Sequence, residues 1–174
     1  RILRAAHHAP SVGFSQPWDF LLVRDLDTRT RVKAAFEKAN RNAAEMFDPE
    51  RRERYRKFKL EGIIESPINI CVTYDHARFG PVVIGRTSQP LMGQYSAVCA
   101  VQNLWLAARC EGLGVGWVSI IEPDDLRQAL LLPSGILPIA YLCVGYVTDF
   151  PQRPDLESAG WLPRMKLSDG VRLD

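Results

Sequence analysis

Residues 95–121, which read YSAVCAVQNLWLAARCEGLGVGWVSII, decide the fold of this chain. The first part of the stretch has apolar residues at helical spacing, at positions 97, 98, 101, 104, 105 and 108. The opposite side of the predicted helix is nearly as apolar, with Cys99, Ala100, Leu106 and Ala107. Because a helix that is apolar on every side is typical of a protein interior, we expect this helix to be buried. It should end near Gly112, and a strand from Val115 to Ile121 should follow.

Two amides, Gln102 and Asn103, lie in the middle of the predicted helix. Buried amides need hydrogen-bond partners. We therefore expect both side chains to tie the helix to neighbouring elements rather than to contact a ligand.

The composition is that of one ordinary globular domain, spanning residues 1–174. Hydrophobic residues make up 47% of the chain and charged residues 24%, and the formal net charge is +2. A domain of this length buries most of its apolar surface without disulfides or metals. The small net charge does not suggest a nucleic-acid partner, and no apolar run reaches the ~18 residues of a membrane span. Because no signal peptide is visible, we expect a cytoplasmic protein.

Cysteines and histidines give no indication of a metal site. The four cysteines are scattered and form no CxxC pair: Cys71, Cys99, Cys110 and Cys143. We expect buried thiols in a reducing compartment. His7 and His8 point to different sides of a helix because they are adjacent, and no HxxxH pattern follows them, so we predict no metal.

The remaining segments are short helices and strands. Apolar and β-branched runs predict strands at residues 19–23, 68–74 and 137–147. Helical patterns cover residues 30–42 and 126–131, and a charged amphipathic helix is expected within residues 43–66. Together with the long buried helix, these elements predict an α+β fold.

A loop from Pro10 to Trp18 precedes the first predicted strand. Its sequence, PSVGFSQPW, contains two prolines, one glycine, two hydroxyls and an amide. Free backbone amides and hydroxyls suit a phosphate-bearing or sugar-bearing ligand, but an ordinary turn has the same composition. The residues alone leave both interpretations open.

Ser119 is a second candidate for function. It falls within the apolar predicted strand, where a hydroxyl is unexpected. Such a hydroxyl either bonds the backbone or faces a ligand. The residues alone do not decide between these two roles.

The helix sequence AVQNLWLAA, followed by EGLGVGW and a strand, resembles the central helix of the flavin-dependent nitroreductase superfamily. The loop PSVGFSQPW is similar to the superfamily's PSxxNxQPW loop, with Phe14 in place of the asparagine. The resemblance implies a three-layer sandwich with a mostly antiparallel sheet and a buried central helix. It also implies a homodimer that builds flavin sites between its two subunits, with the central helix at the seam.

Within the superfamily, AAHHAPSVGFSQPWDF and GRTSQPLMGQYSAVCAVQNLWLAARCEGLGVGWVSI resemble the 5,6-dimethylbenzimidazole synthases. This implies oxygen-dependent fragmentation of reduced FMN, which is then a substrate, to the lower base of cobalamin. NAD(P)H would act only indirectly, through a separate flavin reductase. One alternative is a conventional nitroreductase or quinone reductase that keeps its FMN and uses NAD(P)H. A second is a flavin-binding protein without catalysis.

The same resemblance assigns expected roles to individual residues. Ser119 is expected beside N5 of the flavin ring, as the catalytic residue. The loop residues Ser11, Gly13 and Gln16 are expected to contact the flavin. The remaining expected contacts are two apolar lid residues, Met46 and Leu60, and a late basic residue near the phosphate, Arg164.

The chain begins with Arg1, and its first residues read as a helix already under way. The superfamily carries an arginine-rich, flavin-binding segment with an acidic residue near its N-terminus. We therefore expect that the chain begins inside a longer protein and that this segment precedes Arg1. The catalytic acid is accordingly not named.

Overall fold

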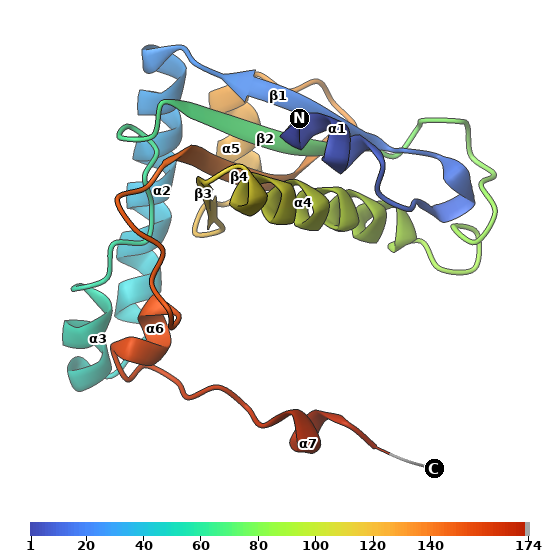
Figure 1. Cartoon of the computed structure of the whole chain (residues 1–174). Helices are drawn as coiled ribbons and strands as arrows, with labels where there is room; N and C mark the ends of the chain where they lie inside the picture. Colours follow the sequence, from blue (N-terminus) through green and yellow to red (C-terminus); the bar gives the residue numbers. More distant parts are fainter. Residues whose placement is uncertain (173–174) are drawn as a thin grey trace.

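The computed structural model describes residues 1–172 and is built on a four-stranded sheet (Figure 1). The strands are β1 (Trp18–Val23), β2 (Ile68–Asp75), β3 (Leu113–Val118) and β4 (Ile136–Tyr146). Their order is β1-β2-β4-β3, and all three pairings are antiparallel. The predicted antiparallel sheet is confirmed. Strands β1 and β3 form its two edges.

Helices cover both faces of the sheet. Those before β2 are α1 (Ile2–His7), the short 3-10 helix η1 (Val12–Phe14), α2 (Leu26–Glu45) and α3 (Pro49–Tyr55). Those after it are α4 (Met92–Cys110), α5 (Pro123–Leu130), α6 (Asp155–Ser158) and α7 (Leu167–Gly170). One face packs against α1 and α4, and the other packs against α2 and α5. The predicted α+β, three-layer sandwich is therefore confirmed.

The two cores follow from the alternation of side chains along the strands. Val72 and Leu142 point to the α4 side, where small residues of α4 such as Ala97 and Ala100 allow close packing. The neighbouring Cys71 points to the opposite side, where α2 and α5 pack. The sheet is thus apolar on both faces and needs a helical layer on each.

The prediction that α4 is buried on every side is wrong for the single chain. Its buried residues are Gly93, Ser96, Ala97, Ala100, Val101, Leu104 and Ala108, which recur at helical spacing on one face. The opposite face leaves Tyr95, Val98 and Leu106 exposed, and Gln102 is exposed as well. Asn103 donates to the carbonyl oxygen of Ala5 at 3.2 Å, which ties α4 to α1 as predicted.

Two predicted boundaries also differ from the structure. Strand β3 begins at Leu113 and its ladder ends at Val118, opposite Tyr141, so Ser119 lies just beyond the strand in a segment without regular structure. The charged segment forms only the short helix α3, which begins at Pro49 after the N-cap Asp48. The residues from 58 to 62 then run without helical structure.

The second half of α2 extends away from the sheet, and α3 and α6 lie beside its far end (Figure 1). This long helix begins after Asp25, whose carboxylate accepts from the backbone N–H of Thr28 at 2.8 Å. Hydrogen bonds from Thr28 lower the pKa of Asp25. Within residues 1–172, no helix is both long and apolar enough to cross a membrane.

Candidate functional site

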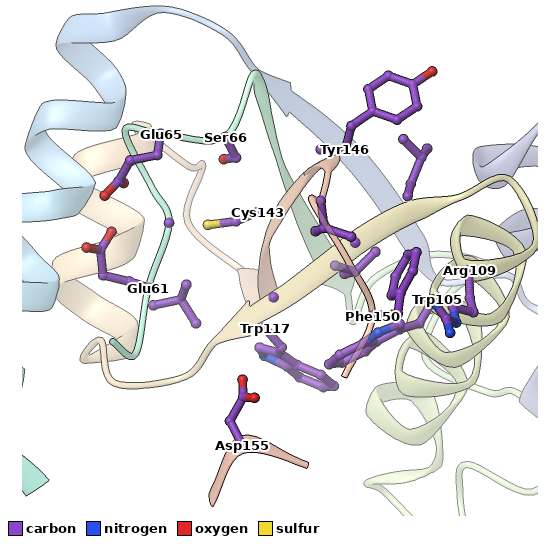
Figure 2. Close-up of a pocket in the computed structure, with 18 of the residues that line it drawn as sticks. Glu61, Glu65, Ser66, Trp105, Arg109, Trp117, Cys143, Tyr146, Phe150 and Asp155 are labelled. Atoms are coloured by element: carbon purple, nitrogen blue, oxygen red, sulfur yellow. The ribbon is translucent and has the colours of Figure 1, made fainter. Parts of the chain in front are cut away.

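A cleft of about 1010 Å³ opens along the edge strand β3 (Figure 2). Five segments border it: the end of α4, β3, the end of β4, the chain after β4, and the segment from Lys59 to Pro67. Its volume is at the upper end of the range of small-molecule and cofactor sites, which is about 300–1,000 Å³. The cleft is therefore large enough for a ligand with several fused rings.

Aromatic side chains make one end of the cleft apolar. Trp105 comes from α4, Trp117 from β3 and Phe150 from the segment after β4, and the three lie near one another in Figure 2. All three are half-buried. Gly114 lets the chain after β4 approach β3, because a Cβ atom at this glycine would collide with the Val147 side chain. A flat aromatic ligand suits these walls.

Arg109 brings a positive charge to the aromatic end. Its guanidinium carbon lies 3.3 Å from the centroid of the Phe150 ring, a stacked cation–π arrangement. Arg109 makes no ion pair or side-chain hydrogen bond with any residue that the structure describes. Its N–H groups are therefore available to an anionic ligand group, which a guanidinium binds through paired hydrogen bonds.

The opposite wall, residues 61–67, is held in place by two cations of α2. Arg29 is buried and donates to the carbonyl oxygens of Ile64 at 2.6 Å and Ser66 at 2.9 Å. Lys33 forms an ion pair with Glu61. Glu61 also accepts from the backbone N–H of Ile63 at 2.7 Å. This wall is a fixed surface because its backbone and its carboxylate are both bonded.

The cysteines divide into two kinds, which corrects the prediction of four buried thiols. Cys71 and Cys143 are buried, whereas Cys99 and Cys110 are exposed at the surface of α4. Burial raises the pKa of Cys71 to about 12 and also raises the pKa of Cys143, so both thiols are neutral and weakly nucleophilic near neutral pH. Among residues 1–172, no group of three His, Cys, Asp or Glu side chains could hold a metal ion.

Of the predicted site residues, Leu60 lines the cleft and Ser119 lies next to it. Leu60 is half-buried and directly precedes the fixed wall. Ser119 follows the lining residue Val118 directly and is exposed. Its hydroxyl has no hydrogen-bond partner in the part of the chain that the structure describes, so it is free to contact a ligand at that edge of the cleft.

The predicted binding loop lies elsewhere, beside the first turns of α4. The backbone N–H of Val12 donates to the Ser96 hydroxyl at 3.0 Å. The Ser11 hydroxyl accepts from the backbone N–H of Gln16 at 3.0 Å, and the Gln16 amide donates to the carbonyl oxygen of Phe14 at 2.6 Å. Gly13 has a φ of 54°. None of these residues lines the cleft of their own chain.

Met46 and Arg164 also lie outside the cleft. Met46 follows the end of α2 and is 83% exposed. Arg164 is exposed in the tail and has no ion pair or side-chain hydrogen bond within residues 1–172. One chain therefore brings together Leu60 and Ser119, and it leaves the loop and these two residues apart.

Sequence reasoning missed the residues that build the cleft walls: Trp105, Arg109, Trp117 and Phe150. Trp105 and Trp117 read as core residues of a helix and a strand, and Phe150 begins a tail with few apolar residues. The sequence did contain a signal for Arg109. It lies on the same helical face as Gln102 and Leu106, and a charged residue on a largely apolar helix indicates a site where an anion could bind.

The profile of the Nitroreductase family matches residues 1–146 of the chain. The chain belongs to the nitroreductase family. Its relatives include two proteins that share one name. It is 40% identical to the 5,6-dimethylbenzimidazole synthase of Rhodospirillum rubrum over 94% of this chain and 78% of that protein. It is 35% identical to the protein of the same name from Rhodobacter capsulatus, over 88% of this chain and 74% of that protein.

Two solved structures share the fold of this chain. Iodotyrosine deiodinase bound to FMN and 3-iodo-L-tyrosine superposes with a TM-score of 0.71 at 23% identity, covering 88% of this chain and 79% of that one. A BluB-like flavoprotein from Clostridium difficile superposes with a TM-score of 0.69 at 17% identity, covering 99% of this chain and 86% of that one. At these identities the likeness concerns the fold.

The cleft fits the flavin that this nitroreductase-family fold implies. A flavin ring is flat and aromatic, which suits the walls formed by Trp105 and Trp117. FMN also carries an anionic phosphate, to which the N–H groups of Arg109, unpaired within residues 1–172, could donate hydrogen bonds. Leu60 supplies an apolar surface at the border of the cleft next to the fixed wall. These residues would hold the ring and the phosphate, while Ser119 would meet a polar atom at the ring edge.

Proposed function

We propose that this protein is a 5,6-dimethylbenzimidazole synthase, which fragments reduced FMN with oxygen to form the lower base of cobalamin. The observation that carries the proposal is the 40% identity to a protein of that name over 94% of the chain. The aromatic cleft supports it, since it offers a site for a large flat substrate. The flavin is then a substrate and is consumed.

Bound reduced FMN supplies the electrons that reduce oxygen and the ring carbons that become the benzimidazole. The chain's own residues bind, orient and shield it. Trp105 and Trp117 bind the ring and exclude water, and Arg109 holds an anionic group. The Ser119 hydroxyl fixes the ring edge at which the chemistry occurs, in a site where a single well-placed donor has a large effect on rate.

We further propose a homodimer in which the loop of one subunit completes the cleft of the other. The exposed apolar face of α4, with Tyr95, Val98 and Leu106, is a surface that a second copy would bury. A partner would also supply the loop containing Ser11 and Gly13, which does not reach the cleft of its own chain. In this arrangement the predicted site residues come together across the seam.

The reducing equivalents come from NAD(P)H through a separate flavin reductase, because the synthase accepts FMN already reduced. We place the protein in the cytoplasm. All four cysteines are free, and two of them are exposed, as is usual in a reducing compartment.

The test uses the full-length protein with excess FMN, a flavin reductase, NAD(P)H and oxygen, followed by mass analysis of the products. We expect 5,6-dimethylbenzimidazole to accumulate while FMN is consumed. Recovery of all the FMN would contradict the proposal. Reduction of an added nitroaromatic, with the FMN retained, would instead identify a conventional nitroreductase, and tight FMN binding without any turnover would identify a flavin-binding protein.

A variant then tests the role of Ser119 within this reaction. Ser119→Ala should lower the rate of benzimidazole formation by about tenfold or more, because it removes a hydroxyl at the ring edge. Ser168→Ala, in the exposed tail, is the matched control and should keep the wild-type rate. Equal rates for the two variants would remove Ser119 from the mechanism.

A further inference from the structure

An aromatic cluster outside the cleft joins two segments that are far apart in the sequence. The Trp161 ring meets Phe47 and Phe58 edge to face, with centroid distances of 5.3 and 5.4 Å. Arg51 and Arg54 of α3 lie over the same ring, with guanidinium carbons 5.5 and 5.9 Å from its centroid. Trp161 thus sits among side chains of the segment 47–58, which we call the α3 segment.

The backbone beside Trp161 is bonded to the same partner. Arg54 donates to the carbonyl oxygens of Ala159 at 3.4 Å and Gly160 at 2.5 Å. The α3 segment is in turn anchored to α2, because the Tyr55 hydroxyl donates to the Asn40 side chain at 2.6 Å. Helix α6 contributes no buried residue of its own. The attachment of this part of the tail therefore depends on Trp161 and on the two bonds from Arg54.

The cluster adjoins two borders of the cleft. On one side, Phe58 is followed at once by Lys59 and Leu60, which line the cleft. On the other side, α6 begins with Asp155, which also lines the cleft and points toward it in Figure 2. Hydrogen bonds between residues 156–161 close the turn that connects Asp155 to Trp161, including Trp161 N–H to the carbonyl oxygen of Leu156 at 2.8 Å.

We propose that Trp161 is a positioning residue that couples these two borders, so that the α3 segment and the tail from Asp155 to Trp161 close over the cleft as one unit. The inference rests on the proposed function only for its catalytic consequence. When Trp161 leaves the cluster, the two borders separate and water reaches the cleft. Reduced FMN then passes its two electrons to oxygen, giving oxidised FMN and hydrogen peroxide in place of the benzimidazole.

The first experiment needs no substrate. Six basic residues between positions 51 and 59 are trypsin sites: Arg51, Arg52, Arg54, Arg56, Lys57 and Lys59. Trp161→Ala should raise the rate of tryptic cleavage in this stretch by about tenfold, because two aromatic contacts and two cation–π contacts are lost. Trp161→Phe should restore much of the protection. Leu162→Ala, at an exposed neighbour in the same segment, is the matched control and should cleave like the wild type.

The second experiment measures how reduced FMN is partitioned between benzimidazole and hydrogen peroxide. Trp161→Ala should shift the products toward peroxide, and Trp161→Phe should return them toward benzimidazole. Unchanged cleavage in Trp161→Ala overturns the coupling, whether or not the protein makes benzimidazole. Increased cleavage with an unchanged product ratio overturns the positioning role. If the wild-type protein makes no benzimidazole, the proposed function fails, and the cleavage rates still decide the coupling.

Discussion

Gly13 determines the conformation of the loop from Pro10 to Trp18, which lies beside the first turns of α4. Its φ of 54° lies in the left-handed region that side chains with a Cβ atom rarely adopt. A Cβ atom there would lie 2.6 Å from the Val83 side chain and 3.0 Å from the carbonyl oxygen of Ile84. Both the dihedral angle and the close approach of residues 83–84 therefore require glycine.

Gly13→Ala should destabilise the protein by about 2–3 kcal/mol, because it adds overpacking to backbone strain. Gly112→Ala is the matched control, since Gly112 has a φ of 73° but no atom within 4 Å of the place that a Cβ atom would occupy. It should cost only about 1 kcal/mol. Denaturant unfolding measures both values. Equal decreases in the free energy of unfolding would show that the contact with residues 83–84 does not contribute to stability.

Thiol reactivity at individual cysteines follows from burial. At pH 8, a maleimide should modify the exposed Cys110 in the folded protein and leave Cys71 and Cys143 unmodified, since burial raises the pKa of both buried thiols. Raising the pH toward 10 should not label Cys71, whose pKa is about 12. Peptide mass mapping reads the result, and denatured protein gives the fully labelled reference. Rapid labelling of Cys71 in folded protein would contradict this packing.

At the scale of elements, the sequence was enough to find α4 from its helical spacing and the strands from their apolar, β-branched runs. It did not separate the two faces of α4. Leu106 and Leu104 are equally apolar, yet Leu104 packs against the sheet and Leu106 is 59% exposed. That difference depends on which face of α4 packs against the sheet, and the local sequence pattern does not show this.

Leu131 is an element boundary where the sequence is not optimal for stability. It ends α5 in the left-handed conformation, with a φ of 54°, and is 80% exposed. Leu131→Asn should raise the free energy of unfolding by about 0.5–1 kcal/mol, because asparagine tolerates this conformation better. Leu156→Asn, an exposed leucine inside α6, should bring no such gain. A thermal melt decides, and a lower melting temperature for Leu131→Asn would contradict the argument.

For the whole molecule, the sequence predicted the fold but not the cleft. Leu60 and Ser119 lie at the cleft, whereas Ser11, Gly13 and Gln16 lie at the other end of α4. Trp105, Trp117 and Phe150 come from three elements, and their meeting depends on tertiary packing. Motif reasoning points to single residues, but it does not say which of them meet in space.

The proposed homodimer is tested at the exposed face of α4. Leu106→Glu should yield a monomer in sedimentation velocity, because it places a charge in the seam. It should also increase maleimide labelling of Cys99, which lies on the α4 surface. Leu131→Glu, an exposed leucine after α5, is the control and should leave the dimer intact. A wild-type monomer, or a dimer that survives Leu106→Glu, would contradict the proposed seam.

The central claim is that the flavin is consumed, and one single-turnover measurement tests it most directly. FMN is reduced chemically, mixed with the full-length protein in the absence of oxygen and of any reductase, and then exposed to oxygen once. We expect benzimidazole to appear in the same molar amount as the FMN that is lost. Complete recovery of oxidised FMN, with no benzimidazole, would contradict it.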